Sequence, residues 1–226
     1  MILASINFAL DFRVVRGDVL SYVRDPECRL FVVFWLGACA FLSFNTWGSI
    51  YPTLGEAVRS SVFQCTSIVS TTGYATTDFN QWPNPSKLML VVLMFTGACA
   101  GSTAGGMKMV RVLVVFKTML RELRTYMRPQ AIVQVKLGAK PVDPDTVSNI
   151  CIFFAIFLLV FGGGTFLMTF FTPDLVTAST SVIATLGNIG PGLNLVGPAE
   201  TFAFIPAPGK LLLTLFMLLG RLELFT

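Results

Sequence analysis

TSIVSTTGY at residues 66–74 decides the fold of this chain, because it aligns without gaps with TSVIATLGN at residues 180–188, an offset of 114. A second pair of segments, SKLMLVVLMFTG at 86–97 and GKLLLTLFMLLG at 209–220, matches at an offset of 123. Each copy has a long apolar stretch, a shorter segment ending in Thr-x-Gly, a polar region with proline, and a further apolar stretch. Internal matches of this kind predict two tandem copies of one structural unit.

The composition around these repeats is typical of a membrane protein. Hydrophobic residues make up 54% of the 226 positions and charged residues 12%, with a mean hydropathy of +0.74, which is far from the average of soluble domains. Segments 30–50 and 147–171 contain no charged residue and reach the roughly 20 residues that cross a hydrocarbon core. We therefore predict an all-α integral membrane protein.

The shorter segments, 54–70 and 174–184, fall short of a full crossing. We expect them to be re-entrant pore helices that enter the membrane and return. Non-helical backbone at membrane depth must be buried in protein or line a wet cavity, where inward carbonyls can replace the hydration shell of a cation. The alternative is that Gly73 and Gly187 simply cap buried helices, but two aligned copies favour the pore loop.

A glycine-rich stretch, GACAGSTAGGMK at residues 97–108, interrupts the apolar span that begins near Lys87. It is not a phosphate-binding loop, because Met107 separates Gly106 from Lys108 and no Ser or Thr follows. Four glycines sustain a helix poorly, so we predict a discontinuous helix at an ion path. The alternative is a glycine-rich packing contact between helices.

Arg221 follows the second apolar match and aligns with Ala98 in this break. An arginine inside a span is costly without a partner or water. We predict a positive charge near the floor of a cavity, where it would repel cations or hold the loop by bonding to its carbonyls, with Glu223 as a salt-bridge partner or solvated. The alternative is an arginine that reaches the cytosolic surface from a helix end.

Other functional classes have little support in the residues. The chain has no histidine, and its five cysteines form no CxxC pair, so no metal, redox or other cofactor site is predicted. No nucleophile and base pair lies within the spans, which disfavours an enzyme, and the basic residues do not form a nucleic-acid-binding face. They mark topology instead and predict a cytosolic N-terminus and central connection. They are Arg13, Arg16, Arg24 and Arg29, then Lys108, Arg111, Lys117, Arg121, Arg124, Arg128, Lys136 and Lys140.

Together these motifs resemble the Trk/Ktr/HKT superfamily of cation transporters, and the arginine motif resembles its TrkH branch most. The resemblance covers essentially the whole chain, including NFAL at 7–10 and RDPE at 24–27. It rests on STTGY at 70–74, AGSTAGGMK at 100–108, GNIGPG at 187–192 and GRLE at 220–223. Members of this family have four such repeats around one pore, and this sequence matches the third and fourth, its C-terminal half.

The resemblance implies a site and a substrate, potassium. Its filter carbonyls would be those of Thr71, Thr72, Gly73 and Tyr74 and of Thr185, Leu186, Gly187 and Asn188. Its gate would be a loop through Gly97, Gly101, Ser102, Thr103, Gly105 and Gly106, together with Arg221. The Tyr74 and Asn188 side chains are as consistent with props behind the filter as with ion ligands.

The resemblance also implies partners and a location. Family members form homodimers in the bacterial inner membrane and sit on a cytosolic nucleotide-binding regulatory ring. The basic segment 108–140 is in a position to touch that partner, or equally to lie against anionic lipid headgroups. The expected domains are the cytosolic lead-in 1–29, a pore repeat 30–107 with filter 71–74 and broken span 86–107, a connection 108–146, and a pore repeat 147–226 with filter 185–188 and span 206–226.

Two repeats supply half of a four-part filter, so we expect a missing N-terminal pore half as a partner. A competing hypothesis is that the chain alone is a half-pore or structural remnant without transport activity, because a complete filter needs carbonyls on all sides of the ion.

Overall fold

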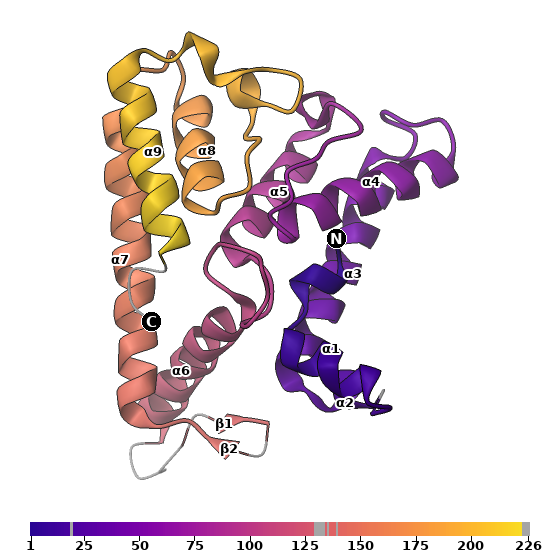
Figure 1. The fold of residues 1–226 in the computed structure, drawn as a ribbon, viewed down its shortest axis with the longest axis vertical. Helices are drawn as coiled ribbons and strands as arrows, with labels where there is room; N and C mark the ends of the chain where they lie inside the picture. Colours follow the sequence, from indigo (N-terminus) through magenta and orange to yellow (C-terminus); the bar gives the residue numbers. More distant parts are fainter. Residues whose placement is uncertain (19, 129–133, 135, 139, 223–226) are drawn as a thin grey trace.

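The computed structural model describes residues 1–18, 20–128, 134, 136–138 and 140–222, and it confirms the predicted helical class (Figure 1). The helices are α1 (Phe8–Val15), α2 (Ser21–Arg24), α3 (Pro26–Thr46), α4 (Leu54–Val69), α5 (Asn84–Thr96), α6 (Met109–Met127), α7 (Pro144–Met168), α8 (Leu175–Leu186) and α9 (Ala207–Arg221). Short 3-10 turns are η1 (Leu3–Ser5), η2 (Phe79–Gln81), η3 (Asn194–Val196) and η4 (Phe202–Phe204), and a small hairpin pairs β1 (Lys136–Leu137) with β2 (Lys140–Pro141).

Helices α3 and α7, of 21 and 25 residues, are the two described helices long and apolar enough to cross a membrane. Each begins with Asp-Pro, a residue pair suited to the first helical turn. Asp25 caps α3 by accepting the amide of Cys28 at 2.8 Å. The proline starts explain why α3 begins at Pro26 rather than residue 30, and α7 at Pro144 rather than residue 147.

Two groups of helices share one order of elements. Helices α3, α4 and α5 have 21, 16 and 13 residues, and α7, α8 and α9 have 25, 12 and 15, so each group is a long helix followed by two shorter ones. The second helix packs against the long one in each group, and α8 also packs against α9 (Figure 1). The groups meet where α5 contacts α8 and where the Phe95 ring lies edge-on against Phe157 and Phe161 of α7.

Helix α6 lies in the segment expected to be part of a cytosolic connection. After the break at 97–108 the chain becomes helical again at Met109 and continues to Met127. The hydropathy of the sequence did not predict this helix because it contains many basic residues. Met109 and Val114 are nevertheless buried, and the helix packs against α3 and α7. The break therefore separates two helices instead of ending a span.

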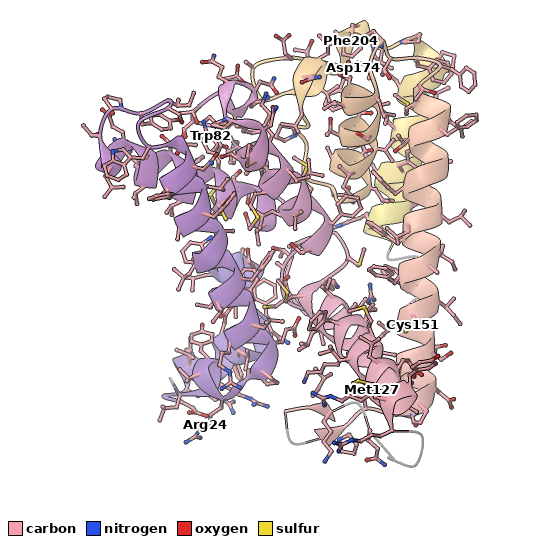
Figure 2. The ribbon with its side chains drawn as sticks, turned by 180° about the vertical axis from the view of Figure 1, so that it is seen from behind. Arg24, Trp82, Met127, Cys151, Asp174 and Phe204 are labelled. Carbon is pink, nitrogen blue, oxygen red and sulfur yellow. The ribbon has the colours of Figure 1, made fainter. Side chains whose placement is uncertain are left out.

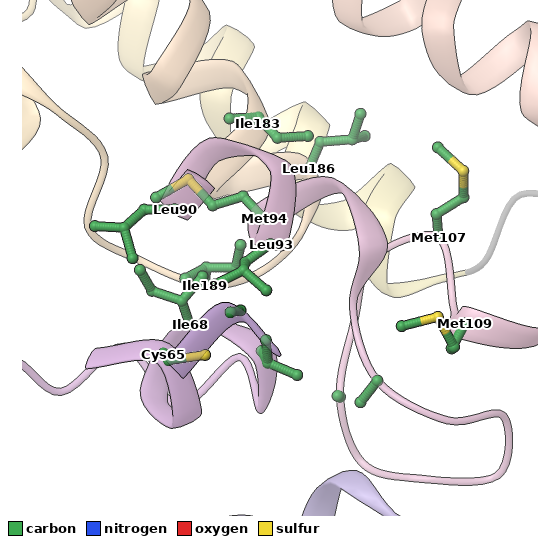
Figure 3. Packing of buried hydrophobic residues seen from close by; sticks show 14 of the residues in the cluster. Cys65, Ile68, Leu90, Leu93, Met94, Met107, Met109, Ile183, Leu186 and Ile189 are labelled. Atoms are coloured by element: carbon green, nitrogen blue, oxygen red, sulfur yellow. The ribbon is translucent and has the colours of Figure 1, made fainter. Parts of the chain in front are cut away.

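The core gathers behind the turns that end α4 and α8. Figure 3 shows Ile68 of α4, Leu90, Leu93 and Met94 of α5, and Ile183 and Leu186 of α8 in this cluster. All six are at most 1% exposed. Burying side chains of this size contributes roughly 1.5–3 kcal/mol each against water exposure. The C-terminal ends of α4 and α8 are thereby anchored in the hydrophobic core.

Candidate functional site

The turn that ends α4 has an unusual backbone. Thr71 and Gly73 have φ of 52° and 73°, the left-handed region that threonine rarely adopts. The amide of Thr71 bonds to the carbonyl of Ile68 at 3.0 Å, and those of Thr72 and Gly73 bond to Ser67 at 3.0 and 3.4 Å. The Ser67 hydroxyl also donates to the Tyr74 carbonyl at 2.6 Å. The turn thus leaves the helix sharply and is tied back to it.

The turn that ends α8 has the same bond pattern. The amide of Asn188 bonds to Thr185 at 3.0 Å, and those of Ile189 and Gly190 bond to Ala184 at 2.8 and 3.5 Å. Asn188 and Gly190 have φ of 54° and 112°. The backbone therefore pairs Thr71 with Asn188 and Gly73 with Gly190. The backbone match is shifted by three residues from the gapless sequence alignment, which paired Gly73 with Gly187.

The contacts of the carbonyl groups in the second copy agree with this three-residue shift. Thr185 and Leu186 belong to α8, and Gly187 is its C-terminal cap with an ordinary φ of −79°. The Thr185 carbonyl is engaged by the amide of Asn188, and the Leu186 carbonyl lies against the Cα of Gly220, where a Cβ would clash with it. These residues are buried, whereas Gly190 is exposed. In this turn Asn188 is partly exposed, Ile189 is buried and Gly190 is exposed.

The two turns lie side by side. A Cβ added to Gly73 would clash with the carbonyl oxygen of Ile189 and would lie 3.2 Å from the Pro191 ring. Glycine at position 73 therefore serves two needs, a positive φ and the close approach of the second turn. The next residue, Tyr74, is 69% exposed.

The break at 97–108 forms a loop whose ends meet. The amide of Met109 donates to the carbonyl of Ala98 at 2.9 Å, and a Cβ on Gly97 would lie 2.8 Å from the Gly105 carbonyl. Gly97, Gly101 and Gly106 have positive φ, and so does Lys108. Within the loop the Ser102 hydroxyl donates to the Cys99 carbonyl at 2.5 Å.

The loop lies directly against both turns. The amide of Gly105 donates to the Thr71 hydroxyl at 3.1 Å. A Cβ on Gly105 would lie 2.5 Å from the Gly187 carbonyl, so only glycine fits between the two turns at this point. The structure thus brings together residues of three segments that the sequence predicted separately: the two turns and the glycine-rich loop.

Arg221 reaches the same loop from α9. Its Nη1 donates to the carbonyl of Thr103 at 3.2 Å, which is the loop contact expected for this side chain. Near it, the amide nitrogen of the Asn188 side chain donates to the Met217 carbonyl at 3.3 Å, so Asn188 also braces the second turn against α9. Glu223 lies outside the described residues.

Two further contacts to the loop were not expected from the sequence. The N-terminal segment bonds to it through main-chain atoms, and one oxygen of Glu27 accepts the amides of Ala100 at 2.6 Å and Val110 at 3.2 Å. Nothing in the local sequence pattern points to the contacts of Glu27, because Ala100 and Val110 lie 73 and 83 residues after it in the chain. The glutamate two positions after a helix-capping aspartate reads as an ordinary first-turn acid.

On the opposite side of the turns, polar side chains join the outer loops. Asn80 accepts the amide of Asn194 at 2.8 Å and donates to its carbonyl at 2.9 Å. The Asn194 side chain donates to Asp174 at 2.9 Å, and Asp174 caps α8 by accepting the amide of Thr177 at 2.8 Å. Partial burial opposes ionisation, but these hydrogen bonds outweigh it and lower the pKa of Asp174 below its ordinary value of 3.8.

The site offers backbone oxygens and amides rather than charged ligands. Across the described residues no group of three or more His, Cys, Asp or Glu side chains is placed to hold a metal ion. Backbone carbonyls are the kind of ligand that can replace the hydration shell of a monovalent cation.

Comparisons with known proteins are consistent with each other. A family model described as "Cation transport protein", TrkH, matches residues 1–226. The chain is 36% identical to the Trk system potassium uptake protein TrkH of Halomonas elongata and 34% identical to that of Salmonella typhimurium, over all of this chain and 47% of each relative. The crystal structure of the potassium transporter TrkH from Vibrio parahaemolyticus superposes with a TM-score of 0.90 at 32% identity, over 99% of this chain and 48% of that one. The chain thus spans about half the length of these relatives.

Proposed function

The chain belongs to the TrkH family of cation transport proteins, and from that premise we propose that it supplies two of the pore repeats of a potassium pathway. The repeats are α3–α5 and α7–α9, with α4 and α8 as pore helices. Potassium is the substrate, and it passes down its gradient between carbonyls of the turns that follow α4 and α8. The loop 97–108 is the gate, held in place partly by Arg221.

One observation carries the proposal: the turns after α4 and α8 repeat the same three backbone hydrogen bonds and the same two positive φ positions, and they lie side by side with the loop beneath. A capping glycine alone would account for one such turn but not for their apposition. In the second copy we place the filter at Asn188, Ile189 and Gly190, in place of Thr185, Leu186 and Gly187. In the first copy it stays at Thr71, Thr72 and Gly73.

The proposal extends to surroundings and partners. Helices α3 and α7 cross the bilayer of a bacterial inner membrane, and the end that carries α1, α2 and the β1–β2 hairpin faces the cytosol (Figure 1). Exposed apolar residues on α6, Phe116, Met119 and Leu123 among them, stand beside its basic residues. We place the contact with a nucleotide-binding regulatory subunit, within a homodimer, at this end.

Two turns surround an ion on part of its circumference only, so conduction requires a further pore half. We therefore expect no rubidium uptake from the chain alone in membrane vesicles, and uptake when it is assembled with the N-terminal half of a TrkH family member. Robust uptake by the chain alone would contradict the half-pore proposal.

The filter assignment is tested in the same assembly. Gly73→Ala places a Cβ against the Ile189 carbonyl, and we expect selective rubidium uptake to fall at least about tenfold, since the displacement costs on the order of 1–3 kcal/mol. Gly55→Ala, in α4 with open space around it, is the matched control and should leave uptake unchanged. Normal selectivity in Gly73→Ala would refute the filter assignment.

A further inference from the structure

The loop 97–108 is held on the side away from the filter by the N-terminal segment. The amides of Cys99 and Thr103 donate to the carbonyls of Ser5 and Ala4 at 3.0 and 3.3 Å, and the amide of Phe8 donates to the carbonyl of Gly101 at 3.1 Å. The Thr103 hydroxyl adds a bond to Ala4 at 3.2 Å. A segment almost a hundred residues away in sequence therefore runs along the loop and bonds to both of its halves.

Glu27 bonds both to the same loop and to the helix that follows it. One carboxylate oxygen accepts the amide of Ala100, inside the loop, and of Val110, in the first turn of α6. Helix α6 has no side-chain cap of its own, because its N-cap position is Lys108. Glu27 supplies that cap from α3, and a carboxylate at a helix N-terminus is favoured by the helix dipole.

Bonds of this kind are strong where water is scarce. A charged acceptor makes a bond worth more than a neutral one, and both amides that Glu27 accepts follow buried residues in the sequence, Cys99 before Ala100 and Met109 before Val110. The loop also bonds to the Thr71 hydroxyl, through the amide of Gly105, and to the guanidinium of Arg221, through the carbonyl of Thr103.

We propose that Glu27 and the N-terminal segment Ala4–Phe8 are positioning elements that clasp the loop 97–108 in its place beneath the filter. Helices α1 and α2 follow this segment, so a movement of these helices is transmitted to the loop through the clasp. The inference rests on the proposed function only in giving the loop the role of a gate. The clasp itself is a property of the chain that can be measured without any ion flux.

Cys99 reports directly on the clasp. It is 1% exposed, its own amide bonds to Ser5, and the next residue, Ala100, bonds to Glu27. Cys39 in α3 is 5% exposed and does not belong to the loop, so it reports on the fold as a whole. In membranes that contain the full chain, maleimide labelling of each cysteine is followed by mass spectrometry of its peptide, with Cys99→Ser confirming the assignment.

Removal of the carboxylate is the first variant. Glu27→Ala should raise the labelling rate of Cys99 roughly tenfold or more, the effect of losing two bonds to a charged acceptor, with Cys39 unchanged. Glu27→Gln keeps an acceptor oxygen and should give a smaller rise. Glu56→Ala, an exposed glutamate in the first turn of α4, is the matched control and should change neither rate.

Removal of one main-chain bond is the second variant. Phe8 is the first residue of α1, where proline fits the helix and the preceding residue, Asn7, already has an extended ψ of 123°. Phe8→Pro therefore deletes the donor to Gly101 with little other change, and Cys99 labelling should rise roughly threefold. Phe8→Ala removes the ring and keeps the donor, so it should leave Cys99 protected.

Unchanged Cys99 labelling in both Glu27→Ala and Phe8→Pro would overturn the proposal. An equal rise at Cys39 would also overturn it, because Glu27 would then hold the whole fold rather than the loop. Rubidium flux measured on the assembled transporter separates this inference from the proposed function. A wild-type assembly without flux refutes the pore, whereas the labelling of Cys99 still decides the clasp.

Discussion

At the scale of single residues, the two turns place different residue types, Thr71 and Asn188, at the position that requires a positive φ. Both have a φ near 50°, a region in which asparagine is enriched and a β-branched residue is strained. The cost at Thr71 is on the order of 1–3 kcal/mol. Its hydroxyl accepts the Gly105 amide, and asparagine at this position could not supply the same hydroxyl. The strained residue thus links the turn to the loop beneath it.

The three-residue shift gives a prediction at this scale. Gly190→Ala meets no atom within 4 Å but requires a φ of 112°, so it distorts the turn without a clash. We expect the preference for rubidium over sodium in the assembled transporter to fall about tenfold, which corresponds to roughly 1.4 kcal/mol. The measurement is rubidium uptake in the presence of competing sodium.

Gly187→Ala is the matched variant. Its φ is ordinary, and a Cβ there would lie 3.0 Å from the Ile183 carbonyl and the Ile189 side chain, which requires a small adjustment. Selectivity should be retained. Lost selectivity in Gly187→Ala together with normal selectivity in Gly190→Ala would restore the register of the gapless alignment.

At the scale of elements, helix α8 depends on the cap at its outer end. Asp174→Ala removes the acceptor for the Thr177 amide and the partner of the Asn194 side chain. We expect a loss of about 1 kcal/mol in the free energy of unfolding, measured by thermal melting in detergent at pH 7. A loss within error would mean that the outer loops hold α8 without the cap.

The same residue predicts a pH dependence. The pKa of Asp174 is lowered in the folded chain from its ordinary value of 3.8, so its contribution is fully present above that value and is lost as pH falls through the folded value. The stability difference between wild type and Asp174→Ala should therefore be constant from pH 7 to pH 5 and shrink below pH 4. A difference that grows on acidification would contradict this sign.

The elements also show what a sequence can and cannot predict. Apolar length predicted α3 and α7, and the offset of 123 places α5 and α9 correctly, since Asn84 and Ala207 begin these helices. The offset of 114 differs from the backbone match because a sequence alignment compares side chains. The backbone conformation of the turns is visible only from their hydrogen bonds and φ angles. The contact of Glu27 with the loop depends on tertiary approach and has no local signal.

At the scale of the whole molecule, the two ends of its long axis carry different elements. Figure 2 shows Arg24 and Met127 at one end and Trp82, Asp174 and Phe204 at the other. Helix α2 and the end of α6 therefore lie at the same end of the molecule. That end faces the cytosol in the proposed orientation.

This orientation is tested with two introduced cysteines. Met127 and Phe204 are 74% and 43% exposed, so Met127→Cys and Phe204→Cys should fold normally. A membrane-impermeant maleimide applied to spheroplasts should label Phe204→Cys only, and it should label Met127→Cys after the membrane is opened. The wild-type chain, whose cysteines are buried or partly buried, serves as the background. Labelling of Met127→Cys in intact spheroplasts would invert the proposed topology.

The loop 97–108 leaves the helical frame and returns to it at nearly one point, because the amide of Met109 bonds to the carbonyl of Ala98. This bond joins the two ends of the loop, so the angle between α5 and α6 does not depend on the number of residues in the loop. Insertions and deletions at the tip leave the helices where they are. A change of length at the tip is therefore compatible with the helices around it, provided that Gly105 keeps its place between the two turns.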